Sequence, residues 1–556
     1  MGSPWVDVGP MQACPVVTPY GAAGSSGAAS SPPPPPVVVV GSPGATLEVG
    51  APGAVEPGVA GFVPGVVPSV PVMLDDVAPA VVVLVEPPSS DEHAASGASA
   101  TSAAAARAAC RAVRRAVGAM GAPGSADGRP GSRTLGHNGH RASRRTVGTG
   151  GGGAVPYSSG RIVHDADAHI MEPPTWLRDH ADPAVRDRIA PLRYPGGNEL
   201  RQTGDVAEQQ RDLVAAFDRL ADKHRSAAYR ADEEEQIMLR KNFAATGSFL
   251  AEDRPRALDL LGFSSQLVFN TFHNRRLHDW EHSGDRQLAE GTARAHNRGM
   301  VEFCSVDDRL LPTCYVPLAD IERAGALATE AIELGAAALL VASGCPPGHS
   351  PSHIGLDPVW AQAEEAGIPI VFHVGGTGDL VDPGYFVNGL PVPPDFHGGE
   401  ENFRSVDYMG IPGPPAQTLA TLIFDGVLDR FPTLRFGVIE QGAIWVPSWT
   451  RQMESAFEAF ARHEERLQRL SLRPTEYVER QVRVTPYPTE DVGWIVEQSG
   501  PDVLLFNSDY PHVEGGRRPL ERFEASLGDA DETVRRKFYC DNFVDLMGRA
   551  GLGLAS

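Results

Sequence analysis

The stretch Asp165-Ala166-Asp167-Ala168-His169, followed by Ile170-Met171-Glu172-Pro173, is the starting point for the fold of this chain. Just upstream, Arg161-Ile162-Val163 predicts the start of a strand over 161–167. Side chains alternate along a strand, so Asp167 and His169 point to the same face and can converge on one metal ion. Taken alone, a strand end with a polar cap is the simpler interpretation. Candidate ligands at other strand ends favour the metal site.

Downstream of this stretch, short apolar runs alternate with amphipathic helices. Strands are expected at 161–167, 265–270, 311–317, 337–342, 369–373, 434–440, 481–485 and 503–508. The helices between and after them are expected at 285–304, 320–334, 358–366, 416–430, 446–470, 491–498 and 532–547. Eight such units predict an α/β fold, a (β/α)8 TIM barrel with insertions. A doubly wound open sheet is the alternative, but no glycine-rich phosphate loop follows the first strand.

Residues 1–157 have a different composition from the rest of the chain. They contain the proline run 32–36, the alanine run 103–106 and the glycine run 150–153, with few aromatic residues. Such a sequence cannot offset its ordering entropy, which predicts a disordered low-complexity tail and a barrel domain over 158–556. The tail's acidic residues and arginines balance, so the net charge of −22 lies on the barrel domain. Arg107 to Arg145 form a basic block, but without interleaved aromatics it favours solvated sequence over a nucleic-acid arm.

Several classes of protein do not match this sequence. The start of the chain has no basic and apolar signal segment, and the valine-rich runs are too short to cross a bilayer. Six cysteines without CxxC spacing predict ordinary thiols in a reducing cytoplasm rather than a disulfide framework. We therefore expect a small-molecule substrate and neither a nucleic-acid nor a membrane partner; a homo-oligomer stays open.

The candidate site residues lie at the carboxyl ends of the predicted strands, where barrel enzymes carry their chemistry. Asp167 and His169 belong to the first strand, His373 ends the fifth, and Asp509 follows the eighth. Four nitrogen and oxygen ligands of this kind suit one divalent ion, Zn²⁺ or alternatively Mn²⁺, with a position open for water. Glu440, which closes the sixth strand, is a further candidate. A buried core histidine at 373 and a turn residue at 509 are the alternatives.

Four motifs in chain order resemble the amidohydrolase-related branch of the amidohydrolase superfamily, which includes aminocarboxymuconate-semialdehyde decarboxylase and aromatic acid decarboxylases. The resemblance covers about 160–549, and its motifs are Asp165-Ala-Asp-Ala-His169 with Glu172-Pro173, Val371-Phe-His-Val-Gly-Gly376, Val438-Ile-Glu-Gln-Gly442 and Asn507-Ser-Asp-Tyr-Pro-His512.

The resemblance implies roles for matching positions. Asp167 and His169 stand at the first-strand metal pair, His373 at the fifth-strand metal histidine, and Asp509 at the eighth-strand aspartate. Two positions depart from the family: the first ligand is Asp rather than His or Glu, and Glu440 replaces a catalytic histidine of the decarboxylases. No lysine in 337–343 is available for carboxylation between two metals, which favours one ion.

These assignments predict a hydrolase that acts next to a carbonyl through a metal-activated water. Asp509 is the expected base, with Glu440 and His512 as further catalytic candidates. Non-oxidative decarboxylation of an aromatic or enol-type acid is the first alternative, and a catalytically silent binding barrel is the second. Because Glu440 replaces the decarboxylase histidine, hydrolysis is favoured. The residues expected to line the substrate pocket are His273, Asn274, Trp280 and His397.

Overall fold

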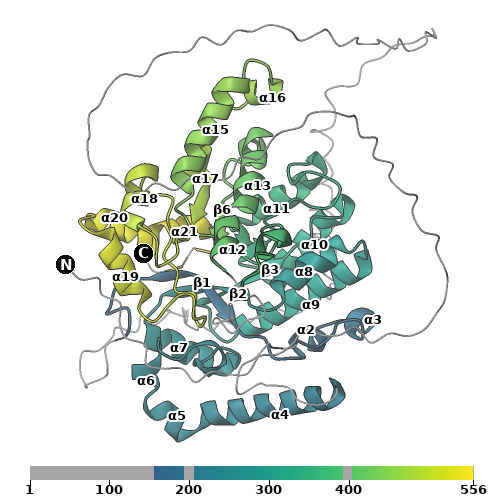
Figure 1. The fold of residues 1–556 in the computed structure, drawn as a ribbon, viewed down its shortest axis with the longest axis vertical. Coiled ribbons are helices and arrows are strands. Elements are labelled where there is room, and N and C mark those ends of the chain that lie inside the picture. The colour runs from purple at the N-terminus through teal and green to yellow at the C-terminus, as the bar shows by residue number, and fades with distance from the viewer. Residues whose placement is uncertain (1–155, 193, 195–205, 392–403, 552, 555–556) are drawn as a thin grey trace, which may run out of the picture. The chain divides into compact units, whose positions relative to one another are not determined.

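The computed structural model describes residues 156–192, 194, 206–391, 404–551 and 553–554. The predicted tail up to residue 155, and His397, lie outside the described residues. Seven parallel strands form one sheet in sequence order, each paired with the next, with helices outside them (Figure 1). The strands are β1 (His164–Ile170), β2 (Ser265–Asn270), β3 (Leu310–Tyr315), β4 (Ala338–Leu340), β5 (Ile370–His373), β6 (Phe436–Ile439) and β7 (Val482–Val484).

The eighth predicted strand is an extended segment, residues 503–510, which we call the closing segment. Its bonds to β7 run from Val484 N to the Val503 carbonyl (2.8 Å) and from Leu505 N to the Val484 carbonyl (3.0 Å). On its other side it accepts backbone bonds from β1, at 3.0 Å from Ala166 N to Phe506 O and 2.7 Å from His169 N to Tyr510 O. The closing segment therefore joins β7 to β1, and the predicted (β/α)8 barrel is confirmed.

The first strand begins three residues later than predicted and continues to Ile170. Its register with β2 shifts between Asp165 and Ala168, where β1 has one residue more than its partner. Such bulges bend a strand and re-aim side chains, and they are common beside active sites. Asp165 and Asp167 lie inside the strand as predicted, and His169, expected just after the strand, also lies inside it.

The helices alternate with the strands and cover the sheet (Figure 1). The longer helices are α4 (Val206–Arg225), α7 (Arg254–Leu261), α8 (Asn274–His282), α9 (Arg286–Cys304), α10 (Ile321–Leu334), α11 (Asp357–Ala366), α13 (Gly413–Phe424), α15 (Val446–Phe460), α17 (Pro474–Gln481), α18 (Val492–Ser499) and α19 (Pro519–Leu527). The shorter helices are α2 (Trp176–Asp179), α3 (Pro183–Arg186), α5 (Ala227–Ala231), α6 (Glu233–Gln236), α12 (Ser405–Gly410), α14 (Val427–Arg430), α16 (Glu465–Gln468), α20 (Glu532–Arg536) and α21 (Asn542–Met547). Among the described helices, none has the length and apolar character to cross a bilayer.

Local sequence explains where these helices begin and end. The Asp320 side chain accepts a hydrogen bond from Glu322 N at the start of α10, and Gly335 ends that helix with a φ of +117°. The predicted helix over 416–430 is instead two helices, because Gly426 adopts a φ of +72° between α13 and α14. A left-handed residue cannot continue a right-handed helix, and glycine adopts that conformation without steric cost.

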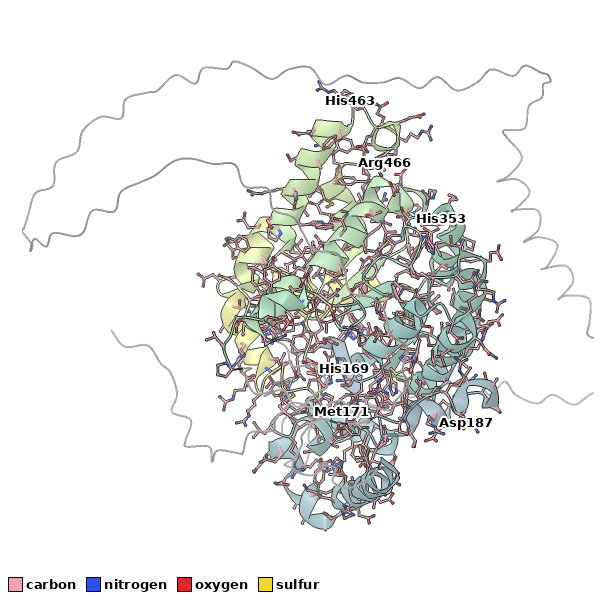
Figure 2. All side chains as sticks on the ribbon, turned by 45° about the vertical axis from the view of Figure 1, so that its right-hand side comes forward. His169, Met171, Asp187, His353, His463 and Arg466 are labelled. Atoms are coloured by element: carbon pink, nitrogen blue, oxygen red, sulfur yellow. The ribbon has the colours of Figure 1, made fainter. Side chains whose placement is uncertain are left out.

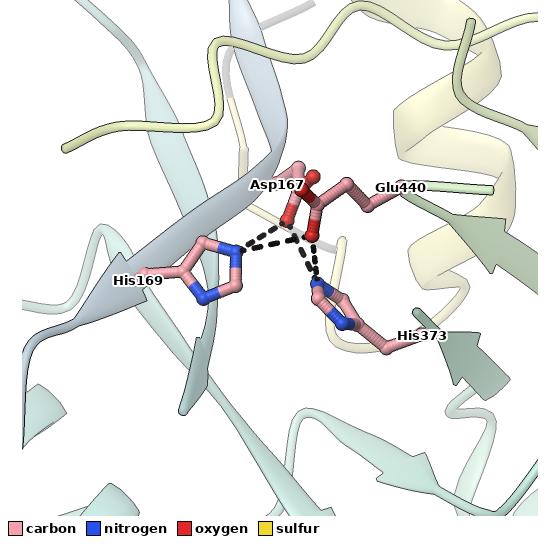
Figure 3. Close-up of side chains that lie close together, drawn as sticks. All are labelled: Asp167, His169, His373 and Glu440. Carbon is pink, nitrogen blue, oxygen red and sulfur yellow. Dashed lines mark hydrogen bonds and ion pairs between the residues drawn. The ribbon is translucent and has the colours of Figure 1, made fainter. Parts of the chain in front are cut away.

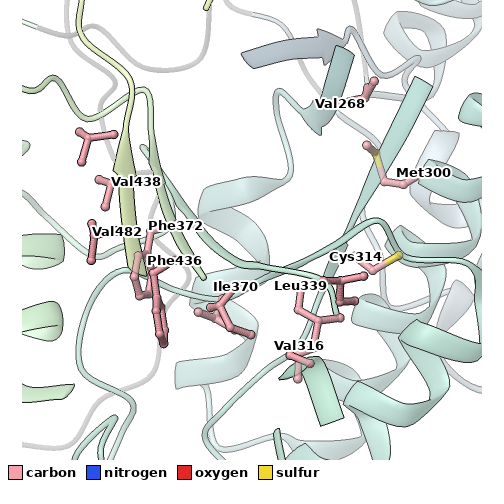
Figure 4. Packing of buried hydrophobic residues seen from close by; sticks show 14 of the residues in the cluster. Val268, Met300, Cys314, Val316, Leu339, Ile370, Phe372, Phe436, Val438 and Val482 are labelled. Atoms are coloured by element: carbon pink, nitrogen blue, oxygen red, sulfur yellow. The ribbon is translucent and has the colours of Figure 1, made fainter. Parts of the chain in front are cut away.

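The core has two layers on either side of the strands. One layer packs the strands against the outer helices, with side chains such as Val268, Ile370, Phe372, Phe436 and Val438 fully buried (Figure 4). The other fills the barrel interior and includes Leu267, Phe269, Leu311, Leu340, Val371, Ile439 and Leu505. His169 and Met171 are buried, and Figure 2 labels them near the middle of the view, with His463 and Arg466 near the top.

A smaller apolar cluster joins the α4 insertion to the barrel. It combines Leu213, Phe217 and Leu220 of α4 with Met171 and Phe272, which follow β1 and β2. Burying such a set of apolar side chains contributes about 1.5–3 kcal/mol for each large residue. Helix α4 therefore packs against Met171 and Phe272, which lie next to the strand ends where the candidate site is found.

Candidate metal centre

Four polar side chains converge at the carboxyl ends of the strands (Figure 3). Asp167 and His169 come from β1, His373 ends β5, and Glu440 directly follows β6. Asp167 Oδ1 lies 3.2 Å from His169 Nε2 and 3.3 Å from His373 Nε2, and Glu440 Oε2 lies 3.2 Å from His373 Nε2. One ligand atom from each residue falls within 4.8 Å of all the others. The sequence placed Glu440 in a catalytic role, whereas its carboxylate lies among the candidate ligands.

A second grouping adjoins the first and shares His169 and Glu440 with it. Its other members are Asp509, in the closing segment, and His512. Asp509 Oδ1 lies 3.6 Å from His169 Nε2 and 2.9 Å from His512 Nδ1. Nε2 of His512 lies 2.9 Å from the Thr271 hydroxyl. Asp509 thus belongs to the second grouping and not to the first.

Several buried polar atoms of the two groupings have no hydrogen-bond partner among the described residues. They include Asp167 Oδ2, His169 Nε2 and Asp509 Oδ2. Buried polar groups are normally hydrogen-bonded, and buried charges are normally paired or bound to metal. Carboxylate oxygens and imidazole nitrogens are ligands of divalent Zn²⁺ and Mn²⁺. The donor set therefore fits a divalent cation.

The two ligand histidines present the same ring nitrogen to the cluster. Nδ1 of His169 donates to the Asn270 carbonyl (3.1 Å), and Nδ1 of His373 donates to its neighbour Val374 (2.9 Å). With the proton on Nδ1, the Nε2 lone pair is free to bind a cation. Asn274, which the sequence predicted at the substrate wall, donates to the same Val374 carbonyl and so supports the segment that follows His373.

The two carboxylates that follow the strands share an unusual backbone. Glu440 has a φ of +53° and Asp509 a φ of +50°. For residues other than glycine this left-handed conformation costs about 1 kcal/mol, and it concentrates at functional sites. The turn after each strand therefore aims a carboxylate into the barrel at the expense of local stability.

Comparison with known proteins decides the family. The family described as Amidohydrolase matches residues 245–546, which is just over half of the chain. The chain belongs to the amidohydrolase family. It is therefore an enzyme, either a hydrolase or a carboxy-lyase. The matched region holds His373, Glu440, Asp509 and His512, while Asp167 and His169 precede it.

Solved structures resemble this amidohydrolase at low identity. An amidohydrolase of Mycobacterium avium subsp. paratuberculosis K-10 is 23% identical over 70% of this chain and 100% of its own, with a TM-score of 0.51. This likeness supports the barrel fold. A 5-carboxyvanillate decarboxylase from Novosphingobium aromaticivorans DSM 12444, with manganese bound, is 16% identical over 70% of this chain and 97% of its own (TM-score 0.46). A 2,6-dihydroxybenzoate decarboxylase from Rhizobium is 17% identical over 70% and 98% (TM-score 0.43). No curated protein matches the amidohydrolase in a sequence search.

Burial and neighbouring charges set the protonation of the site. Burial raises the pKa of Asp167, but His169 and His373 outweigh it and hold that pKa well below its usual range. Burial, together with the nearby His512, lowers the pKa of His169 to about 4. For His512 burial acts in the same direction, yet Asp509 outweighs it and raises the pKa to about 9. In the protein without metal, Asp167 is thus charged at neutral pH, His169 is neutral and His512 is protonated.

A cavity of about 580 Å³ opens above the cluster, and His169, His373, Glu440 and His512 line it. Apolar side chains form part of the wall, among them Met171, Phe272, Val374, Leu380, Val381 and Phe386. Arg275 also lines the cavity, where it pairs with Asp279 and Asp379. The cavity places the candidate ligands within reach of a small molecule.

The predicted substrate-binding residues divide into three groups. Asn274 lines the cavity. His273 does not: it is buried, and its Nδ1 lies 3.1 Å from the Glu172 carboxylate. Trp280 is also outside the cavity wall, because it sits on α8 with its ring packed against the hydrophobic core. Residue 397 lies outside the described part of the chain.

The sequence did not single out several residues that support the site. Glu172 was part of the quoted motif, but its role depends on a loop a hundred residues away: its buried carboxylate accepts bonds from the backbone N–H groups of Thr271, Phe272 and His273. Lys241 has a buried ammonium without a hydrogen-bond partner among the described residues. Burial lowers the pKa of Lys241 to about 8, against the opposing effect of Asp509. No spacing or motif marks Lys241 in the sequence, and the motif that contains Glu172 does not reveal what its carboxylate binds.

Proposed function

We propose that this amidohydrolase is a metal-dependent hydrolase that cleaves a bond next to a carbonyl of a small organic substrate. Asp167, His169, His373 and Glu440 hold one divalent ion, Zn²⁺ or Mn²⁺, and Asp509 acts as the base. The observation that carries the proposal is the buried Asp509 carboxylate beside the four-residue cluster, with Oδ1 paired to His512 and Oδ2 without a hydrogen-bond partner among the described residues. Oδ2 can therefore accept a proton while Oδ1 keeps its contact with His512.

The cation supplies Lewis acidity, which lowers the pKa of a water molecule from about 15.7 towards about 7 and polarises a carbonyl. Asp509 removes a proton from the water as its oxygen forms a bond to the substrate carbonyl carbon. His512, 2.9 Å from Asp509 and part of the cavity wall, returns a proton to the leaving group as its bond to that carbon breaks. Thr271, which contacts Nε2 of His512, orients that imidazole.

Decarboxylation of an aromatic or enol-type acid is the second candidate, and one observation favours it. His512 lines the cavity next to Asp509, where it is placed to deliver a proton to a substrate carbon. The loss of carbon dioxide requires such a proton and no added water. Against this candidate, the sixth strand ends in a carboxylate that already lies among the candidate ligands.

Isotope incorporation separates the two reactions. The metal-loaded enzyme is screened on small esters and lactones and on carboxylated phenols. Hydrolysis in ¹⁸O-labelled water places one ¹⁸O atom in the product acid, whereas decarboxylation in D₂O places one deuterium on the carbon that lost its carboxylate. We expect ¹⁸O incorporation that disappears in Asp509→Asn. Deuterium on carbon, with release of carbon dioxide and no hydrolysis of any ester or lactone, would overturn the hydrolase proposal.

A further inference from the structure

The turn that carries Glu440 is held by side chains from the end of the neighbouring strand. Thr485 directly follows β7, and Tyr487 lies two residues further on. The Thr485 hydroxyl accepts a hydrogen bond from Glu440 N (2.8 Å), and the Tyr487 hydroxyl donates to the Glu440 carbonyl (2.7 Å). Both peptide groups of Glu440 are therefore bound by side chains and not by a strand ladder.

The residues after Glu440 are held from the same side. The Glu490 carboxylate accepts bonds from Ala443 N (2.8 Å), Ile444 N (3.3 Å) and Tyr487 N (3.1 Å), which ties the two loops together. Gly442, with a φ of +67°, leaves no room for a side chain, because an added Cβ would lie 2.7 Å from Glu490 and 3.0 Å from the Tyr487 ring. The turn at 440–444 and the loop at 485–490 are thus in close contact.

The hydrogen bonds with Thr485 and Tyr487 matter because the backbone of Glu440 is strained. Its backbone is left-handed, which is unfavourable for a residue other than glycine, so an unsupported turn would relax to another conformation. The hydrogen bonds from Glu440 N to Thr485 and from Tyr487 to the Glu440 carbonyl oppose that relaxation.

We propose that Tyr487 and Thr485 are positioning residues that hold the Glu440 carboxylate among the metal ligands. The inference rests on the proposed function, because it takes Glu440 to bind the ion. Without the two side-chain bonds, the Glu440 turn relaxes and its carboxylate leaves the 3.2 Å contact with His373. Asp167, His169 and His373 would remain in place, so the expected defect is weaker metal binding rather than loss of the fold.

The test is Tyr487→Phe, which removes one hydroxyl and keeps the ring. We expect the affinity for Zn²⁺, measured by titration of the metal-free full chain, to fall about tenfold, the scale typical of residues that orient ligands. Tyr477→Phe is the matched control, because the Tyr477 hydroxyl makes a comparable bond to Asp429 (2.6 Å) away from the cavity. That control should bind Zn²⁺ like the wild type. Thr485→Val tests the other bond and serves if Tyr487→Phe does not fold.

A Glu440→Gly background separates positioning from general destabilisation. With the carboxylate gone there is nothing to position, so Tyr487→Phe should not weaken Zn²⁺ binding further. An equal loss in both backgrounds, or unchanged affinity in Tyr487→Phe and Thr485→Val, would overturn the inference. If Glu440→Gly itself binds Zn²⁺ like the wild type, the ligand role of Glu440 in the proposed function is the part that fails.

Discussion

Glu440 and Asp509 are two carboxylates with nearly the same backbone and different surroundings. Both follow a strand position of the barrel, and both are left-handed. Glu440 is held through its peptide groups by Thr485 and Tyr487, and its carboxylate contacts His373. Asp509 is held through its neighbour Ser508, whose backbone N–H and hydroxyl both donate to the buried Asp165 carboxylate.

The difference shows how one barrel can give similar acids different tasks. The carboxylate of Glu440 faces the ring nitrogens of His169 on β1 and His373 on β5, among which the proposed cation would bind. The Asp509 carboxylate pairs with His512 through Oδ1, while its Oδ2 has no hydrogen-bond partner among the described residues. The left-handed backbone directs each carboxylate into the barrel. In the proposed function, the side chains around each carboxylate determine whether it binds the metal or accepts a proton. The following predictions test that division, from the largest expected effect to the smallest.

Removal of a ligand histidine should have the largest effect. His169 belongs to both groupings and His373 to the first, so His169→Ala and His373→Ala should each strip the divalent ion and bring turnover to background. Metal content of the purified variants, measured by mass spectrometry, checks this. Full metal occupancy in both variants would refute the site. His353→Ala, at an exposed position away from the cavity, is the control.

Asp509→Asn should lower turnover by about 10²–10⁴-fold, the usual contribution of a general base. The amide keeps the size of the side chain and tolerates a left-handed backbone, but it cannot accept the proton. Metal content should stay near that of the wild type because the four proposed ligands are intact. Normal turnover with a filled site would remove Asp509 from the mechanism, and an empty site would show that it is a ligand.

Glu440→Gln should lower the affinity for the metal more than it lowers turnover of the metal-loaded enzyme. Loss of the charge weakens the proposed fourth ligand, so the affinity for Zn²⁺ should fall at least about tenfold. At saturating Zn²⁺ the loss in turnover should be smaller than in Asp509→Asn. The opposite order of effects would mean that Glu440 moves the proton and that the two carboxylates have exchanged roles.

The pairing of Asp509 with His512 should be visible as a pH-dependent stability in metal-free protein. The pKa of His512 is raised to about 9 in the fold, above an unfolded value of about 6.5. The pairing of protonated His512 with Asp509 therefore stabilises the fold fully below pH 6.5. This contribution is lost as the pH rises through 9 and His512 loses its proton. Asp509→Asn should therefore lower the thermal midpoint more at pH 6 than at pH 10. An equal loss at both values would contradict the pairing.

The smallest effect concerns the strained backbone itself. Glu440→Gly should raise the unfolding free energy of metal-free protein by about 1 kcal/mol, because glycine adopts a left-handed φ without strain. Asp509→Gly relieves the same strain but loses the pairing with His512, so its gain should be smaller. Activity should fall in the same variants. Asp187→Gly, at a right-handed position with a φ of −75°, should give no such gain. Denaturant titration of the three variants measures the difference, and destabilisation by Glu440→Gly would contradict the strain.

Much of the architecture could be predicted from local patterns. Seven of the eight predicted strands correspond to β1–β7, since a buried strand needs a short apolar run and a barrel needs such runs at regular intervals. The eighth is extended and bridges its neighbours without a regular ladder, because side chains of Asp165 and Ser508 take over some of the bonding. The start of β1 was misplaced by three residues, and the bulge within it depends on pairing with β2, which a single strand does not reveal.

By itself, the sequence determined the barrel, the strand-end position of His169, His373, Glu440 and Asp509, and their suitability for a divalent cation. The suitability for a cation follows from the residue types, and the shared position follows because the carboxyl ends of parallel strands lie at the same edge of the barrel. Only the tertiary structure decided which atoms meet. It brought Glu440 rather than Asp509 into the cluster with Asp167 and His373, and buried His273 against Glu172. It also joined Tyr487 to the Glu440 turn. Such contacts depend on loop conformation and backbone angle across more than forty residues of separation, and no local pattern records them.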